Sequence, residues 1–447
     1  DFLRVLYPII ILNTLSVGML WPAIPAILEI PFNGDSAGVA RLSTKISAAN
    51  AVLDFVTNPI LGSLSDAHGR RPFLLQSLFV AACCNAVVAI FGTTMSVVFT
   101  RLAFGVCNIS KAMIYAMIAD VMEHSATTQP ARVKVFGLIG VASGCGFALG
   151  PAVGGLVGAL CSPFVTVAVA SATVGASALL VFFNVNETHR VERTDGVTNR
   201  PHRCDLRSPL EHAVRVVVQN RSVARFSFPF VLSGIAAGPY AIWYYYSEAK
   251  YGWTYSTISS FLALYGVASV AAQGLLLPAL TPNVLNESAT VTLGFFANSM
   301  VFVLYGLLTE AHGLLPFAVL PLCAIGNLSE PVLRKVFSQL VTQQEQGALQ
   351  GALAALSTFS NACGPLLAST LLTAGSSKCT SSSHTTAASS TCSRLLGTPF
   401  FLSSALFILS SVAAAISFLY WDREDREIHS MTPRHTDDRT ETLPLLR

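Results

Sequence analysis

The stretch GSLSDAHGRRP, residues 62–72, lies between two apolar segments that are each long enough to cross a bilayer as a helix. Gly69 allows a positive backbone φ, Asp66 can pair with a neighbouring arginine, and Pro72 can begin a helix. Paired arginines are retained on the cytoplasmic side of a membrane. The stretch therefore predicts two transmembrane helices joined by a very short cytoplasmic loop. The alternative is an ordinary basic loop with no further role.

The composition is typical of a membrane protein. Of the 447 residues, 52% are hydrophobic and 11% are charged, and the mean hydropathy is +0.58. A soluble domain carries about 25% charged residues. The net charge of +3 gives no reason to expect a nucleic-acid partner. The sequence has no phosphate-binding loop and no long soluble segment, so we expect neither ATP-driven transport nor enzyme activity, and no cofactor.

Apolar segments with the length of about 20 residues that a membrane span needs recur along the chain. Six precede a polar central stretch and six follow it. The predicted helices cover residues 5–28, 44–65, 72–92, 96–121, 133–159, 162–184, 223–248, 254–278, 290–309, 313–340, 348–373 and 397–420.

Arginines gather in the polar central stretch and in the tail after the last helix. Because basic residues are retained in the cytoplasm, both termini and the central stretch are predicted to be cytoplasmic. The predicted fold is an all-α integral membrane protein with twelve transmembrane helices. Its parts are an N-terminal six-helix half (1–185), a cytoplasmic linker (186–222), a C-terminal six-helix half (223–421) and a cytoplasmic tail (422–447).

The two halves share a sequence repeat. Gly137 precedes Gly150 in the fifth helix by the same number of residues as Gly351 precedes Gly364 in the eleventh, and proline follows each second glycine. Corresponding interruptions in a two-fold repeated membrane chain indicate a transporter with a central binding site.

The stretch 62–72 resembles the G-x-L-x-D-x-x-G-R-R signature that the major facilitator superfamily carries between its second and third helices. The resemblance implies two pseudo-symmetric six-helix halves that rock about a central cavity and open it to each side in turn. It implies also that Asp66 closes the cytoplasmic side through the start of helix eleven and Arg70. The matching residues are Gly62, Leu64, Asp66, Gly69, Arg70 and Arg71, and all except Leu64 are expected to act in gating.

The fifth helix is similar to the G-x-x-x-G-P-x-x-G-G motif of drug:proton antiporters in the same superfamily, which favours exchange over symport. Glycines at this spacing also let a neighbouring helix approach closely, so tight packing is the alternative interpretation. The matching residues, which we expect to act in conformational gating, are Gly146, Gly150, Pro151, Gly154 and Gly155.

Segments 22–25, 326–331, 346–351 and 364–367 are similar to those of tetracycline-resistance carriers and of hippocampus-abundant-transcript-like proteins. The chain departs from the tetracycline carriers at charged positions. Asn13 stands where they have an aspartate implicated in coupling, which puts proton antiport by that route in doubt. Asp54 replaces a glutamine, Lys111 replaces a small residue, and Glu330 and Arg334 occupy uncharged positions of helix ten.

Asp54 and Lys111 are each expected near the middle of their helices, where an unpaired charge is unfavourable. They could bind an ionised solute or exchange a proton, because a carboxylate held away from water takes up a proton more readily. A permanent salt bridge between helices two and four is the alternative. Glu330 and Arg334 lie one turn apart and could simply satisfy each other. Charges of both signs around the cavity would suit an ionised solute.

Arg101 would be a membrane-embedded cation, and such residues are usually functional or paired. A structural ion pair, or a side chain that reaches the outer face, is the alternative. Tyr244 belongs to an aromatic run in helix seven that is typical of an interfacial belt, of which one or two members could line a cavity. Gln273 in helix eight is a weaker candidate for a solute contact.

The end of the tail resembles an acidic dileucine sorting signal, formed by Glu441 with Leu445 and Leu446. Adaptors that read it would direct the protein to endosomes, lysosomes or vacuoles, and the plasma membrane is the expected location otherwise. Cys379 and Cys392 fall in the last outward loop, where an oxidising compartment would allow a disulfide.

The predicted function is secondary active transport of a small organic solute, by a monomer in the lipid bilayer, with the proton gradient as the energy source. One alternative is an uncoupled facilitator or a proton symporter. Another is a non-transporting sensor or trafficking protein with the same fold.

Overall fold

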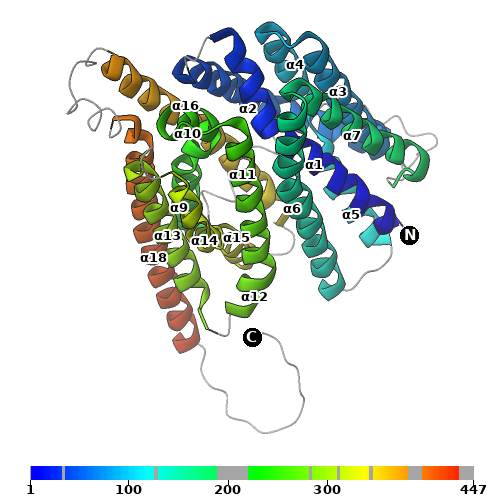
Figure 1. Cartoon of the computed structure of the whole chain (residues 1–447). Coiled ribbons are helices and arrows are strands. Elements are labelled where there is room, and N and C mark those ends of the chain that lie inside the picture. Colours follow the sequence, from blue (N-terminus) through cyan, green and yellow to red (C-terminus); the bar gives the residue numbers. More distant parts are fainter. Residues whose placement is uncertain are drawn as a thin grey trace.

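The computed structural model describes residues 2–32, 36–124, 129–188, 220–280, 284–309, 313–341, 346–380 and 395–431. Every regular element within these ranges is a helix, and the helices form one bundle with the N-terminal half to the right and most of the C-terminal half to the left in Figure 1. Most of the predicted linker, Cys392 and the tail pattern at Glu441, Leu445 and Leu446 lie outside the described residues.

The N-terminal half contains the six predicted spans. Helix four consists of two separate segments. The elements are α1 (Phe2–Glu29), η1 (Ile30–Phe32), α2 (Ser36–His68), α3 (Arg70–Phe91), α4 (Thr94–Cys107), α5 (Ser110–His124), α6 (Gln129–Leu160) and α7 (Pro163–Asn184).

The C-terminal half contains the other six spans, three of which are interrupted. The elements are α9 (Arg221–Ala236), η2 (Gly238–Ile242), α10 (Trp243–Tyr251), α11 (Tyr255–Ala271), η3 (Ala272–Leu276), α12 (Leu277–Leu280), α13 (Glu287–Leu307), η5 (Leu315–Val319), α14 (Leu320–Gly326), α15 (Ser329–Gln339), α16 (Gln346–Thr380) and α18 (Thr398–Met431).

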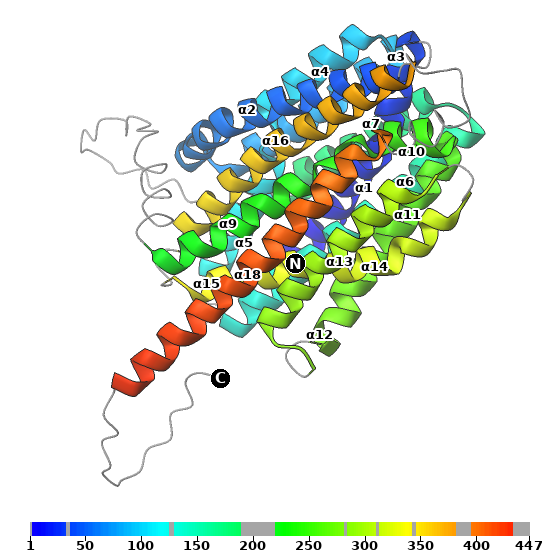
Figure 2. The same cartoon turned by 90° about the vertical axis from the view of Figure 1, so that its left-hand side faces the viewer.

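Ten segments of the described chain are long and apolar enough to cross a membrane. The other two spans are α2, with 33 residues, and α16, with 35 residues, which have the length but a more polar composition. These two helices belong to different halves and pack along each other, as Figure 2 shows. Helices at the interface between halves need less apolar surface because protein covers one side of them. The prediction of twelve transmembrane helices in two six-helix halves is confirmed.

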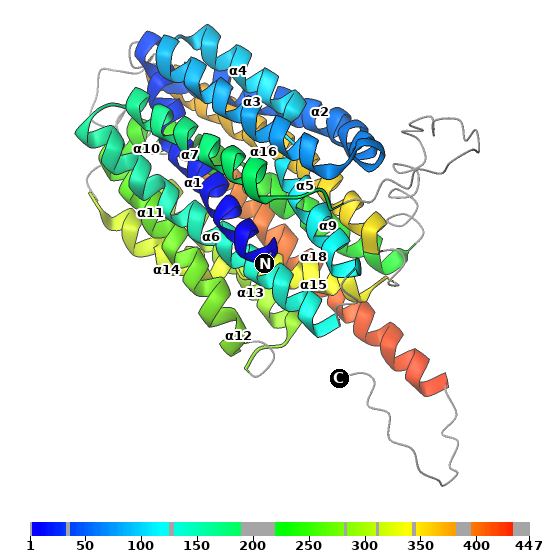
Figure 3. The same ribbon diagram turned by 90° about the vertical axis from the view of Figure 1, so that its right-hand side faces the viewer.

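The side of the molecule where α2 ends and α3 begins is called the signature-loop side below, and the opposite side is called the far side. The hydrogen bonds that join the halves on the far side include two made by hydroxyl donors within the described residues. The hydroxyl of Thr44 on α2 donates to Ser369 on α16 over 2.8 Å, and Tyr255 on α11 donates to the carbonyl oxygen of Gly154 on α6 over 3.0 Å. Figure 3 shows α6 and α11 side by side.

Glycines of α6 bring two neighbouring helices close to its backbone. A Cβ on Gly150 would lie 2.5 Å from the Cα of Gly18 on α1, and a Cβ on Gly155 would overlap the side chain of Ser259 on α11. Gly146 and Gly154 likewise face α1. The predicted tight-packing role of this motif is therefore confirmed, and its glycines join α1 of the same half to α11 of the other.

Helix four is not the continuous helix that the sequence predicted. It is interrupted at Asn108–Ile109, and the hydroxyl oxygen of Ser77 on α3 accepts hydrogen bonds from the backbone N–H groups of Ile109 (3.3 Å) and Ser110 (3.2 Å). The N–H of Ile109 also donates to the carbonyl oxygen of Cys107 (2.9 Å), so Ser77 is its second acceptor, and Ser77 satisfies the first donor of α5 at Ser110. Helix ten, predicted as one span, is interrupted at Asn327–Leu328 between α14 and α15.

The aromatic run of helix seven is buried, so the prediction of an interfacial belt is wrong for most of it. Tyr245 and Tyr246 are fully buried, and Trp243 stacks on Phe261 of α11 with ring centroids 4.8 Å apart. The hydroxyl of Tyr246, the hydroxyl of Tyr251 and the ammonium of Lys250 donate to carbonyl oxygens of the last turn of α13. The run therefore caps a helix end inside the C-terminal half instead of facing the interface.

Candidate functional site

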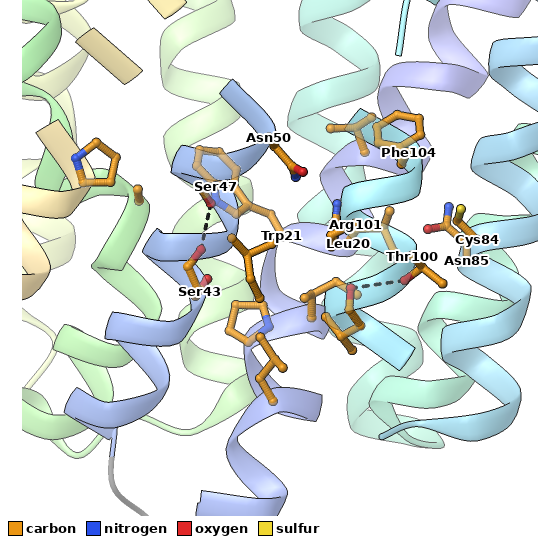
Figure 4. A pocket seen from close by; sticks show the side chains of 18 of the residues that line it. Leu20, Trp21, Ser43, Ser47, Asn50, Cys84, Asn85, Thr100, Arg101 and Phe104 are labelled. Atoms are coloured by element: carbon orange, nitrogen blue, oxygen red, sulfur yellow. Dashed lines mark hydrogen bonds between the residues drawn. The ribbon is translucent and has the colours of Figure 1, made fainter. Parts of the chain in front are cut away.

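A central cavity of about 550 Å³ lies between the halves, towards the far side. Helices α1, α2, α3 and α4 supply most of its lining, and the C-terminal half adds Tyr240 and Asn361. Figure 4 shows the N-terminal part of the lining. Its polar members include Asn13, Asn50 and Asn85, and the rest of the surface is largely apolar and aromatic. A cavity of this size and composition suits a small organic molecule.

Arg101 on α4 is the charged residue among those that line the cavity. In Figure 4 its side chain lies among Leu20, Asn50 and Phe104. Within the described part of the chain, no hydrogen bond or ion pair is made to its guanidinium. A guanidinium offers five N–H donors in a planar fork that matches a carboxylate or phosphate. The cavity thus presents an uncompensated cation to whatever occupies it.

Aromatic side chains surround this cation. Trp21 of α1 packs on Phe147 of α6 with ring centroids 5.0 Å apart, and Phe104 lies one turn beyond Arg101 on α4. Close packing of α2 on α4 holds the neighbouring Asn50, because a Cβ on Gly105 would lie 2.9 Å from its Oδ1. These walls would contact the apolar body of a solute whose anionic group binds Arg101.

A line of polar oxygens continues along α2 from the cavity towards the signature-loop side. Asn50, Asp54 and Asn58 are spaced four residues apart and share one helix face. Each carries a buried Oδ1 atom without a hydrogen-bond partner in the described structure. Asn50 lines the cavity, whereas Asp54 does not. Asp54 lies one helical turn farther along α2, towards the signature-loop side.

Asp54 and Lys111 are not an ion pair in this conformation. No ion pair within the described residues joins them, and the side chain of Lys111 is exposed on α5. The salt bridge between helices two and four, which the sequence left as the alternative, is therefore absent from this part of the structure. The roles of the two residues in solute or proton binding stay predictions.

The other candidates lie away from the cavity, with one exception. Glu330 and Arg334 form the predicted one-turn pair, with 2.9 Å between Arg334 Nη2 and Glu330 Oε1. Gln273 is exposed on η3 and Tyr244 is buried, and neither lines the cavity. Asn13 does line it. The expected mixture of positive and negative charges is thus wrong for the lining, because Asp54, Lys111 and this pair all lie outside it.

The signature loop is held by a carboxylate that the sequence did not single out. Glu187, which follows α7, accepts hydrogen bonds from the backbone N–H groups of Arg70 (2.8 Å) and Arg71 (3.0 Å) at the start of α3. Gly69 has the positive φ expected for it, 98°. The helix begins at Arg70 and not at Pro72, since Glu187 satisfies its first donors.

Arg70 also connects two helices of the N-terminal half. Its Nε lies 3.3 Å from Oδ2 of Asp120 near the end of α5, and its Nη1 donates to the hydroxyl of Ser65 on α2. The side chain of Asp66 is outside the described set, so its predicted contacts with Arg70 and helix eleven stay predictions. The loop is therefore a junction of α2, α3, α5 and the segment after α7.

The comparisons with known proteins agree with this architecture. The model of the Major Facilitator Superfamily matches residues 6–329. Tetracycline resistance protein, class G, from Vibrio anguillarum is 31% identical over 359 residues, which are 79% of this chain and 86% of that protein. Hippocampus abundant transcript 1 protein of Homo sapiens is 22% identical over 323 residues, 72% of this chain and 64% of that protein.

Among solved structures, the human organic anion transporter MFSD10 (TETRAN) superposes with a TM-score of 0.64 and 22% identity, over 92% of this chain and 98% of that one. The fold and the relatives are those of transporters and not of enzymes. The signature loop between α2 and α3, the two six-helix halves and the family match over most of the chain lead to one conclusion: this protein belongs to the major facilitator superfamily of membrane transporters.

Proposed function

We propose that this transporter carries a small organic anion, in exchange for protons, through the cavity around Arg101. The observation that carries the proposal is the guanidinium of Arg101, which lines the cavity without a partner among the described residues. A charge inside a membrane span without a counterion is unfavourable, so a bound anion would stabilise it. A carboxylate fits best, because it can accept two parallel N–H···O bonds from one guanidinium.

The aromatic and amide groups of the lining define the rest of the cargo. Apolar surface is offered by Trp21, Phe104 and Phe147. The amides of Asn13, Asn50 and Asn85 can each donate and accept hydrogen bonds. An organic acid with an apolar body and a few hydroxyl or carbonyl groups would satisfy both. A cation would be repelled by Arg101 and would find no carboxylate among the lining residues.

Proton coupling is assigned to Asp54 in this proposal. Its buried Oδ1 has no hydrogen-bond partner in the described structure, and it lies one turn from the lining residue Asn50. Proton antiporters of the family carry the glycine motif that α6 matches, which supports exchange. The proton gradient would then be the energy source, without a cofactor.

The membrane orientation and the location belong to the same proposal. The positive-inside rule supports an orientation with the signature-loop side, both termini and the linker in the cytoplasm. The dileucine pattern of Glu441, Leu445 and Leu446 would bind sorting adaptors and direct a monomeric carrier to endosomal or lysosomal membranes.

Anion binding can be tested by the thermal stability of the purified protein in detergent. A panel of aromatic and aliphatic carboxylates, each matched with its primary amide, would be added at millimolar concentration. We expect some carboxylates to raise the melting temperature and their amides not to do so, since only a ligand that binds the folded state stabilises it. Arg101→Gln should abolish the shift and Arg101→Lys should retain part of it. Equal shifts with amides, or an unchanged shift in Arg101→Gln, would contradict the proposal.

A further inference from the structure

Helices four and ten carry the same short pattern at their interruptions. The sequence Asn108-Ile109-Ser110-Lys111 in helix four corresponds to Asn327-Leu328-Ser329-Glu330 in helix ten. In both, the asparagine and the aliphatic residue form a two-residue break, and the serine begins the next helical segment, α5 or α15. The fourth position of the pattern carries opposite charges in the two halves.

The symmetry of the fold places these two charges opposite each other. In transporters built from two parallel repeats, the halves are related by a two-fold axis along the membrane normal. Equivalent residues then lie at equal depth on opposite sides of the axis. Lys111 and Glu330 are the second residues of α5 and α15 and are both exposed, with 64% of the Glu330 side chain accessible.

The next turn of each segment supports this placement. Tyr115 lies one turn after Lys111, and Arg334 lies one turn after Glu330. The hydroxyl of Tyr115 is within range of electrostatic interaction with the guanidinium of Arg334. Because these residues belong to different halves, this interaction indicates that α5 and α15 lie near each other on the signature-loop side of the molecule.

In this conformation the charges have not met. Glu330 is bonded to Arg334 on its own helix, and no ion pair within the described residues includes Lys111. The halves are joined on the far side by the bonds of Thr44 to Ser369 and of Tyr255 to Gly154. Alternating access requires a second conformation, in which the far side separates and the signature-loop side closes.

We propose that Lys111 and Glu330 form an ion pair across the signature-loop side when that side closes, and that the breaks at Asn108 and Asn327 are the hinges on which α5 and α15 move. Glu330 would exchange Arg334 for Lys111 or hold both. The ion pair of Glu330 with Lys111 would then replace that of Glu330 with Arg334. Because one ion pair is lost and one is gained, the exchange does not strongly favour either conformation, and the gate stays reversible. The proposal rests on the alternating-access part of the proposed function and not on the identity of the cargo.

Cross-linking in membranes tests the proposal without any cargo. The full chain with Lys111→Cys and Glu330→Cys would be treated with a short bifunctional methanethiosulfonate, and the linked peptides mapped by mass spectrometry. We expect a cross-link between these two positions. The matched control combines Lys111→Cys with Lys335→Cys. Lys335 is on the same segment, but it points to Glu287 of α13 (2.7 Å), and this pair should give no link.

A second pair of cysteines reports on the far side. Thr44→Cys with Ser369→Cys should cross-link in the conformation described here, and trapping this link first should reduce the yield at positions 111 and 330 at least fivefold. The gate would be overturned if the cross-link yield at positions 111 and 330 did not depend on the far-side link. It would also be overturned if positions 111 and 330 gave no cross-link in a chain whose far-side pair does react.

Charge reversal provides a readout that does not need cysteine at the gate. Lys111→Glu would place two carboxylates opposite each other, disfavour closure of the signature-loop side and speed far-side cross-linking at positions 44 and 369 severalfold. Adding Glu330→Lys to Lys111→Glu should return that rate to the original value or below. If the double reversal reacts as fast as Lys111→Glu alone, the two residues do not meet.

Discussion

In the proposed function a single residue, Arg101, selects the cargo of the cavity. A guanidinium stays protonated at every physiological pH, so the lining keeps its positive charge throughout a transport cycle. Any proton-dependent step must therefore involve another group. Asp54 is a carboxylate on the same membrane-embedded face as the lining residue Asn50, one turn away. Cargo binding and proton binding are thus assigned to separate side chains.

Gly69 is the residue on which the signature loop depends most directly. Its φ of 98° is rarely adopted by residues with a side chain, and a Cβ there would lie 2.5 Å from Oε2 of Glu187. We expect Gly69→Ala to destabilise the protein by about 1–3 kcal/mol, seen as a lower melting temperature in detergent. Gly62→Ala is the matched control, since Gly62 is helical and has open space around it. It should be neutral or stabilising by up to about 1 kcal/mol. Equal losses in the two variants would contradict this account of the loop.

Single residues could be predicted from the sequence where a charge interrupts an apolar segment, as Arg101 and Asp54 do. Their surroundings could not be predicted in the same way. That Arg101 has no partner among the described residues depends on which side chains of α1, α2 and α3 converge on it, and no local pattern encodes this. Glu187 escaped notice because a carboxylate just after a membrane span looks like ordinary linker composition. Its function depends on the start of α3, more than a hundred residues earlier in the chain.

Helices four and ten show at the scale of elements how polar residues interrupt a span. Neither break contains a proline, so the usual signal for a helix interruption is missing. The side chain of asparagine competes with the backbone for hydrogen bonds, which weakens a helix at that point. Ser77 on α3 stabilises the break in helix four by accepting hydrogen bonds from the backbone N–H groups of Ile109 and Ser110. The recurrence of Asn-x-Ser in both halves was the signal in the sequence that could have indicated the breaks.

The packing of α6 was easier to predict than that of α10. Glycines at four-residue spacing indicated close helix contacts, but they did not indicate which helices make them. The structure shows contacts with Gly18 of α1 and with Ser259 of α11. The aromatic run in helix seven was misinterpreted because tyrosine and tryptophan serve equally in an interfacial belt and in a buried cluster. The buried cluster forms here because the fold brings the last turn of α13 next to the run, where its carbonyl oxygens accept hydrogen bonds from the tyrosines.

The architecture of the whole molecule followed from hydropathy and from one loop. Twelve apolar segments and a polar centre predicted two six-helix halves, and each predicted span is present. The cavity between the halves did not follow from these patterns, because its shape depends on how the halves meet. Far-side contacts between α2 and α16 and between α6 and α11 set that arrangement.

Proton coupling is a property of the whole transport cycle, and Asp54 is its predicted carrier. In liposomes with an imposed pH gradient, wild-type protein should accumulate a carboxylate that stabilises it, whereas Asp54→Asn should lose accumulation but retain exchange of labelled for unlabelled carboxylate. Asn58→Ala is the matched control, because Asn58 lies on the same face of α2 but cannot titrate. Accumulation by Asp54→Asn at the wild-type level would remove Asp54 from the coupling path. Transport by the wild type that ignores the pH gradient would indicate an uncoupled facilitator.

The central claim is that an organic anion crosses the membrane through the cavity around Arg101. The most direct measurement is counterflow in liposomes that contain the purified protein, with a labelled carboxylate and its matched amide compared in wild type and Arg101→Ala. The account predicts that the carboxylate moves and the amide does not, and that Arg101→Ala lowers carboxylate flux at least tenfold while its melting temperature stays near that of the wild type. The account would be contradicted if the amide or an organic cation crossed the membrane as fast as the carboxylate and Arg101→Ala left that flux unchanged.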